Sequence, residues 1–201
     1  KSLFVATCYQ SSWLVSLGAR SIAESKRRKQ TYFFGEGEII IGSNNYIGDY
    51  STIQAVKNCK VEIGKNCAIS HNVKIYTSSY ITNQNFDIEE ELDVKSGNVI
   101  IGNGVWIGAN VLINPNVKIG DNCIIAGQVG FAGSSTLGNH VMIGGQAGVS
   151  GHLKIGNNVK IQAQSGIGHN IKDNEVLQGS PAFTFRDYYK SYVHFKNLPT
   201  L

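Results

Sequence analysis

Large apolar residues recur at every sixth position through the second half of the chain. Six residues match neither the 3.6-residue period of a helix nor the spacing of a hairpin, so the pattern predicts short strands that each end in a bend. We expect these side chains to point toward a common interior. The twelve positions are Ile101, Ile107, Ile113, Ile119, Ile125, Phe131, Leu137, Ile143, Val149, Ile155, Ile161 and Ile167.

The same phase appears earlier in the chain, from Ile41 to Ile53 and from Ile63 to Ile75. A smaller residue lies two positions before most of the large ones, as Val99 does before Ile101. Three such strands close a triangular coil, and stacked coils pair through their backbones. The sequence therefore predicts an all-β solenoid, a six-coil parallel β-helix over residues 36–171. Asparagines that tolerate the left-handed conformation are expected at its corners: Asn66, Asn103, Asn110, Asn116, Asn122, Asn139, Asn157 and Asn158.

Three segments lack the six-residue phase. Residues 78–97 are rich in acidic side chains and are expected to form an excursion loop, either simply solvated or enclosing a substrate. Residues 1–35 are read as an N-terminal helical segment, with an amphipathic helix over 10–28. Residues 172–201 are read as a C-terminal helical extension with an aromatic face. Because the ends of a solenoid expose its core, we expect both helices to act as covers.

The net charge of +4 is concentrated near the N-terminus. The basic run Lys26–Lys29 is read as a solvated helix end, since no aromatic residues alternate with it as they would in a nucleic-acid site. No apolar run is long enough to span a membrane, and no secretion signal is evident, so a cytoplasmic location is expected. The four cysteines lie far apart without metal-ligand or disulfide-framework spacing: Cys8, Cys59, Cys67 and Cys123. No metal site is expected.

The Ile-Gly hexads over roughly residues 39–171 resemble those of the left-handed β-helix hexapeptide acyltransferases. The resemblance implies a homotrimer of parallel prisms with active sites between neighbouring subunits. It also implies that an acyl group moves from acyl-CoA or acyl carrier protein to a hydroxyl or amine of a sugar or nucleotide sugar. No bound cofactor is implied.

The two halves resemble different branches of that family. Residues 36–122 are similar to sugar O-acetyltransferases, through segments such as IGDYSTIQAV and IGKNCAISHNVKIYTSS. Residues 117–201 resemble the UDP-3-O-acylglucosamine N-acyltransferases of lipid A synthesis, through GQVGFAG and GSPAFTFRDYYKSYVHF. Our hypothesis is a hybrid chain, natural or engineered, joined near residues 112–125.

The two resembled groups place a catalytic histidine where this chain has Pro115 or Tyr80. His71 keeps the His-Asn-Val context, with Asn72 beside it, and is the predicted general base because imidazole titrates near neutral pH. The alternative is that His71 is an outward polar residue. Tyr80 and Asn72 are taken as acceptor contacts.

Four further residues complete the predicted site. His152 matches a second histidine of the lipid A group, which implies substrate contact, against the alternative of a solvated corner. Trp106 either lines a groove for the pantetheine of the donor or lies in a trimer interface. Arg186 and Lys190 lie on the terminal helix, where an acidic carrier protein could dock.

Two rival functions remain at this stage. One is a catalytically disabled or engineered hybrid scaffold, favoured by the substitution of both expected bases. The other is metal-dependent hydration, which needs three converging histidines whose spacing is not apparent in this chain. The acyltransferase interpretation is preferred because the scaffold and one candidate base are both present.

Overall fold

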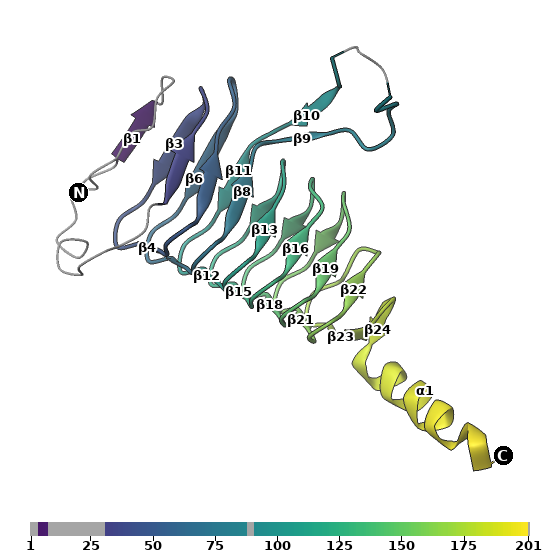
Figure 1. Cartoon of the computed structure of the whole chain (residues 1–201). Coiled ribbons are helices and arrows are strands. Elements are labelled where there is room, and N and C mark those ends of the chain that lie inside the picture. Colours follow the sequence, from purple (N-terminus) through teal and green to yellow (C-terminus); the bar gives the residue numbers. More distant parts are fainter. Residues whose placement is uncertain (1–3, 8–30, 88–90, 201) are drawn as a thin grey trace.

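The computed structural model describes residues 4–7, 31–87 and 91–200, and it shows a three-sided prism (Figure 1). The predicted amphipathic helix over 10–28, Cys8 and the basic run Lys26–Lys29 lie outside the described residues. Three sheets of seven, seven and eight strands form the sides, with six complete coils from β3 to β22 and a partial coil at each end. Sequence periodicity therefore predicted the architecture correctly.

Each of the six complete coils contributes one strand to each side of the prism. The first sheet contains β1 (Phe4–Thr7), β3 (Glu38–Ile41), β6 (Lys60–Ile63), β11 (Val99–Ile101), β14 (Lys118–Ile119), β17 (Thr136–Leu137) and β20 (Lys154–Ile155). The second contains β2 (Tyr32–Phe34), β5 (Thr52–Gln54), β8 (Lys74–Tyr76), β13 (Leu112–Ile113), β16 (Gly130–Phe131), β19 (Gly148–Val149) and β22 (Gly166–Ile167). The third contains β4 (Tyr46–Ile47), β7 (Ala68–Ile69), β12 (Trp106–Ile107), β15 (Ile124–Ile125), β18 (Met142–Ile143), β21 (Lys160–Ile161), β23 (Val176–Gly179) and β24 (Ala182–Thr184).

The interior is filled by the residues that the six-residue period singles out. None of the twelve large apolar side chains from Ile101 to Ile167 is more than 3% exposed. Successive coils pair in parallel and in register, so that Ile101 lies over Ile119 and Ile119 over Leu137. Equivalent side chains therefore stack along the axis, which explains why the period persists through so many coils.

The corners use asparagine in two ways. Five of the eight predicted residues have the expected positive φ, between 56° and 63°: Asn66, Asn110, Asn116, Asn122 and Asn158. The other three precede the left-handed position and join adjacent coils through their side chains, together with two aspartates. In this side-chain ladder Asn103 Oδ1 accepts from Lys65 N (3.0 Å), Asp121 Oδ1 from Asn103 N (2.7 Å), Asn139 Oδ1 from Asp121 N (2.8 Å), Asn157 Oδ1 from Asn139 N (2.8 Å) and Asp173 Oδ1 from Asn157 N (2.8 Å).

Glycine precedes every ladder residue except the last, Asp173, because the side chain of the next coil occupies the space of a Cβ. A Cβ on Gly120 would lie 2.5 Å from Asn139 Oδ1, and one on Gly138 would lie 2.7 Å from Asn157 Oδ1. The repeated Ile-Gly pair thus combines an inward apolar residue with an opening for the ladder.

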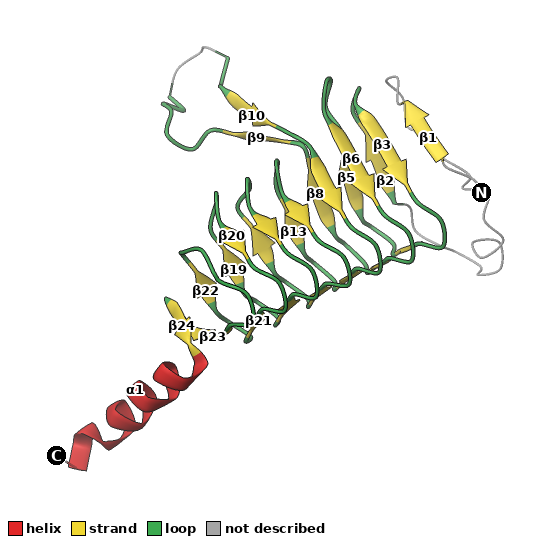
Figure 2. Cartoon of the chain, turned by 180° about the vertical axis from the view of Figure 1, so that it is seen from behind, coloured by secondary structure: helices red, strands yellow, loops and turns green. Residues whose placement is uncertain are grey.

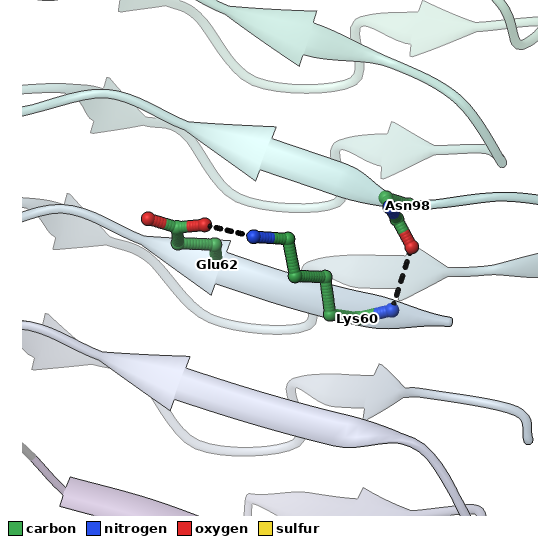
Figure 3. Close-up of polar contacts among 3 residues, drawn as sticks. All are labelled: Lys60, Glu62 and Asn98. Atoms are coloured by element: carbon green, nitrogen blue, oxygen red, sulfur yellow. Dashed lines mark hydrogen bonds and ion pairs between the residues drawn. The ribbon is translucent and has the colours of Figure 1, made fainter. Parts of the chain in front are cut away.

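The described residues of the segment 78–97 form a two-stranded arm rather than a structureless loop. Strands β9 (Ser78–Tyr80) and β10 (Val94–Ser96) pair antiparallel with each other and with no other described strand. Figure 2 shows the arm projecting from the prism beside β8, and along the chain it lies between β8 and β11. Where the chain returns, Asn98 Oδ1 accepts from Lys60 N at 2.8 Å, beside the Lys60–Glu62 ion pair of 2.7 Å (Figure 3). This bond joins the returning coil to the previous one.

The C-terminal helix is present as predicted, but it projects from the prism instead of lying across its end (Figure 1). Helix α1 (Phe185–Asn197) begins after the β23–β24 hairpin, and none of its residues is buried. Its aromatic rings contact one another, with ring centroids 4.6 Å apart for Phe185 and Tyr189. A short 3₁₀ turn, η1 (Leu198–Thr200), follows. No helix in the described ranges is long and apolar enough to cross a bilayer.

Candidate functional site

The prism edge that joins the second sheet to the first is called the arm edge here, since the arm leaves the prism along it. The edge passes through Asn116, Ser134 and His152 in successive coils, each with positive φ. The backbone N–H of His152 donates to Gly133 O at 3.1 Å, which fixes the corner, while the imidazole is exposed. Histidine is among the side chains that adopt this backbone region most readily.

Lys95 of the arm contacts His152, with 3.1 Å between Lys95 Nζ and His152 Nε2. An ammonium group has only donors, so Nε2 must accept, and the neutral ring then has its proton on Nδ1. The contact therefore selects one tautomer of His152 and directs its lone pair toward the arm. Lys95 is itself half-buried.

Two backbone contacts attach the base of the arm to the same edge. Gly97 N donates to Thr77 O at 2.9 Å, and Asn116 Nδ2 donates to Ser96 O at 3.4 Å. A Cβ on Gly97 would overlap the amide of Asn116, so only glycine allows this approach. The arm thus lies over the edge from the coil of Asn116 toward that of His152.

The outward face of the second sheet beside His152 has almost no side chains. Gly130, Gly148 and Gly166 lie in register on consecutive strands. At Gly130, Gly148 and Gly168 an added Cβ would meet no atom within 4 Å. Packing within this chain therefore does not require glycine there. The six outward positions, called the bare face below, are Gly130, Ala132, Gly148, Ser150, Gly166 and Gly168.

His71 lies on a different edge, which joins the third sheet to the second. Its Nδ1 accepts from Asp49 N at 2.9 Å, and its Nε2 lies 3.3 Å from Tyr46 Oη. Because a backbone N–H can only donate, Nδ1 is occupied and the neutral ring has its proton on Nε2. His71 thus joins two coils as the ladder side chains do. To act as a base through Nδ1, it would have to break the hydrogen bond from Asp49 N.

Asn72 also serves contacts between coils. It has a φ of 56°, and its Nδ2 donates to Asn110 Oδ1 at 2.6 Å. In later coils of this edge Gln146 Nε2 donates to Gln128 Oε1 (2.8 Å), and Gln164 Nε2 donates to Gln146 Oε1 (2.9 Å). These amides form a second column of side-chain bonds, in which Asn72 has a structural part.

The remaining predicted site residues lie apart from His152. Tyr80 pairs with Val94, whereas Lys95 pairs with Ser79, so Tyr80 is on the opposite face of the arm from Lys95. Trp106, 44% exposed, is on the outward face of the third sheet, in register with Ile124 and therefore also with Met142.

Arg186 and Lys190 lie on α1, and Lys190 Nζ is 3.8 Å from Asp187 Oδ1.

Sequence reasoning did not single out Lys95. Its only distinguishing signal is that it is the single basic residue of the acidic segment 78–97.

In the part of the chain that the structure describes, no three His, Cys, Asp or Glu side chains converge as metal ligands would. Cys67 and Cys123 are buried thiols, and their Sγ atoms each lie 3.2 Å from a carbonyl oxygen of the next coil. Burial raises the pKa of both thiols. They are therefore suited to packing and not to nucleophilic chemistry.

Residues 98–133 and 134–169 each match the family model described as bacterial transferase hexapeptide (six repeats). The UDP-3-O-acylglucosamine N-acyltransferase of Christiangramia forsetii is 53% identical over 124 residues, which cover 57% of this chain. The chain spans only 36% of the length of that protein.

Among solved structures, UDP-N-acetylglucosamine O-acyltransferase from Moraxella catarrhalis superposes with a TM-score of 0.51 at 21% identity, covering 80% of this chain and 73% of that one. A GDP-perosamine N-acetyltransferase from Caulobacter crescentus, in complex with CoA and GDP-perosamine, gives 0.48 at 16% identity over 70% of this chain and 56% of its own. Together with the family match, the first superposition establishes the fold. Residues 98–169 match the bacterial transferase hexapeptide family, and the described prism has the left-handed parallel β-helix fold.

Proposed function

We propose that the chain transfers an acyl group from a thioester donor to a hydroxyl or amine of a sugar or nucleotide sugar, at the arm edge, with His152 as the general base. The observation that supports this most directly is the exposed imidazole of His152, whose Nε2 is an acceptor, beside the bare face of the second sheet. A surface without side chains allows the extended pantetheine or acyl chain of a donor to lie against the backbone.

The chemistry needs one base near the thioester carbonyl. His152 Nε2 takes the proton of the acceptor as its oxygen or nitrogen attacks the carbonyl carbon, and the C–S bond then breaks. The proton passes from Nε2 to the leaving thiolate. A backbone N–H at a coil corner would stabilise the developing oxyanion, as such donors do in other acyl transfers.

The acyl donor is proposed to be acyl-CoA or an acyl carrier protein. The curated relative is named as an N-acyltransferase that acts on UDP-3-O-acylglucosamine. We extend its substrate class to this chain as a nucleotide-sugar or cell-envelope sugar acceptor. Arg186 and Lys190 on the exposed helix α1 are the proposed docking residues for an acidic carrier.

A homotrimer is proposed because the third sheet exposes an apolar stripe. Trp106, Ile124 and Met142 lie side by side on consecutive strands and are 40 to 44% exposed. Such a contiguous apolar surface is typical of a protein interface. Neighbouring prisms would cover it and place active sites between subunits.

His152→Asn and His71→Asn form a matched pair that tests the base. Asparagine tolerates the left-handed corner at 152, as Asn116 does on the same edge, and at 71 its Oδ1 can accept from Asp49 N. With purified protein, acyl-CoA and acyl-carrier donors and a panel of sugar acceptors, thiol release measures kcat. His152→Asn should lower kcat by about 10²–10⁴-fold, and His71→Asn should leave it within about threefold, since a typical hydrogen bond contributes only about 0.5–1.5 kcal/mol.

The opposite result would assign the base to His71, as sequence reasoning favoured. Absence of transfer by the unchanged chain with every donor would support the rival proposal of a catalytically disabled hybrid scaffold. Circular dichroism of both variants is the control for folding.

A further inference from the structure

The contact between the arm and His152 uses the only basic atom that the imidazole offers. A neutral histidine has one nitrogen lone pair for proton uptake, and here that lone pair is on Nε2. Lys95 Nζ already occupies it at 3.1 Å, while Nδ1 holds the ring proton. In this arrangement neither nitrogen of His152 can accept a proton from an acceptor.

We propose that Lys95 is a latch on the arm that blocks the base, so that the sugar acceptor must displace it before transfer begins. The consequence for catalysis rests on the function proposed above, whereas the latch itself is a property of the arm and the edge. Lys95 is thus an inhibitory residue in the resting state.

The lysine contact and base catalysis exclude each other. The single lone pair of His152 Nε2 cannot accept from Lys95 Nζ and from a sugar acceptor at the same time. The charged residues closest in sequence to the two side chains are the exposed Lys154 on the prism and the exposed Asp93 on the arm. Neither ion pair recorded among the described residues includes Lys95.

The construction of the arm allows it to open. Strands β9 and β10 pair only with each other among the described strands, so their movement breaks no sheet of the prism. Beyond the base of the arm at Thr77, its recorded side-chain contacts with the prism are Lys95–His152 and two longer bonds, from Asn116 Nδ2 to Ser96 O at 3.4 Å and from Ser78 Oγ to Gln54 Oε1 at 3.3 Å. Loss of the lysine contact should therefore release the arm.

Lys95→Met tests the latch, because methionine keeps most of the length of lysine but has no donor. Lys154→Met, an exposed lysine two residues after His152, is the matched control. Long-range proton–nitrogen NMR on histidine-labelled protein, assigned with His152→Asn, should show the Nδ1–H form of His152 in the unchanged chain and its loss in Lys95→Met. Amide exchange of residues 78–80 and 94–96 should accelerate by about 2- to 13-fold in Lys95→Met, as expected for one hydrogen bond of about 0.5–1.5 kcal/mol.

The KM for the acceptor should fall by a similar factor in Lys95→Met and should not change in Lys154→Met. An Nε2–H form of His152 in the unchanged chain, or unaltered arm exchange in Lys95→Met, would overturn the latch. These two measurements do not need activity. If the chain transfers no acyl group, the proposed function fails while the latch is still decided by NMR and exchange.

Discussion

Ile124 and Ile125 are consecutive, identical residues on β15 that point to opposite sides of the strand. Ile125 is 0% exposed and lies in register with Ile107 and Ile143 in the interior, whereas Ile124 is 40% exposed on the apolar stripe. The pair therefore allows the same substitution to alanine to be compared inside and outside the prism.

Truncation of isoleucine to alanine removes three carbon atoms. At about 0.8 kcal/mol for each buried carbon, the transfer term is about 2.4 kcal/mol. At Ile125 the cavity left behind adds to this, and we expect a loss of about 2–5 kcal/mol in the free energy of unfolding. In the isolated prism Ile124 has 40% of its surface in solvent and leaves no closed cavity, so its loss extrapolated to low protein concentration should not exceed about three-fifths of the transfer term, roughly 1.4 kcal/mol.

Urea unfolding followed by circular dichroism at several protein concentrations measures both losses. The effect of Ile125→Ala should not vary with concentration. The effect of Ile124→Ala should vary with protein concentration, because association stabilises a trimer by mass action. Light scattering should give three times the chain mass of 21.8 kDa. Equal losses, or a larger loss at Ile124, in the limit of low protein concentration would refute the inward register, since a slip of one residue exchanges the two faces. A stable species of 21.8 kDa would refute the trimer.

Three more predictions concern other parts of the molecule. Burial raises the pKa of the Cys67 and Cys123 thiols, so their contribution to stability is complete below the ordinary value of 9.0 and is lost as the pH rises above it. Alanine at both positions should therefore make the unfolding free energy depend less steeply on pH above 9.0. Gly148→Leu should change stability by less than about 0.5 kcal/mol and raise the KM for the donor about tenfold, or about 1.4 kcal/mol; an unchanged KM would contradict donor binding on the bare face. Glutamate at Arg186 and Lys190 should weaken carrier binding in low salt without affecting turnover of acyl-CoA, and no binding by the unchanged chain at low salt would leave α1 without this role.

The interior of the prism was predictable from sequence because a six-residue period has one simple structural solution. Phe131 and Leu137 could be assigned to the core without any knowledge of their neighbours. The positive φ of Asn110 and Asn116 followed in the same way from the tolerance of asparagine for tight corners.

The site was less predictable, because its contacts depend on the direction of the arm. Lys95 and His152 are 57 residues apart, and no period relates them. The His-Asn-Val context of His71 indicated the right chemical group, but a sequence cannot show that a backbone N–H occupies its nitrogen. For α1, the aromatic spacing predicted a helix correctly but gave no information on its direction. The hybrid origin of the chain stays a prediction, which separate searches with residues 1–112 and 125–201 would test.

The side-chain ladder at the corners also bears on the chemical ageing of the protein. Asn139 accepts the hydrogen bond of Asp121 N through its side-chain oxygen, so conversion of Asn139 to aspartate by deamidation would keep this bond. Yet the two aspartates of the ladder, Asp121 and Asp173, never occupy consecutive coils. Deamidation at 139 would bring two carboxylates to about 4.8 Å, a repulsion of about 1 kcal/mol in a water-like dielectric. An aged molecule would therefore keep its shape while losing stability in a manner that added salt restores.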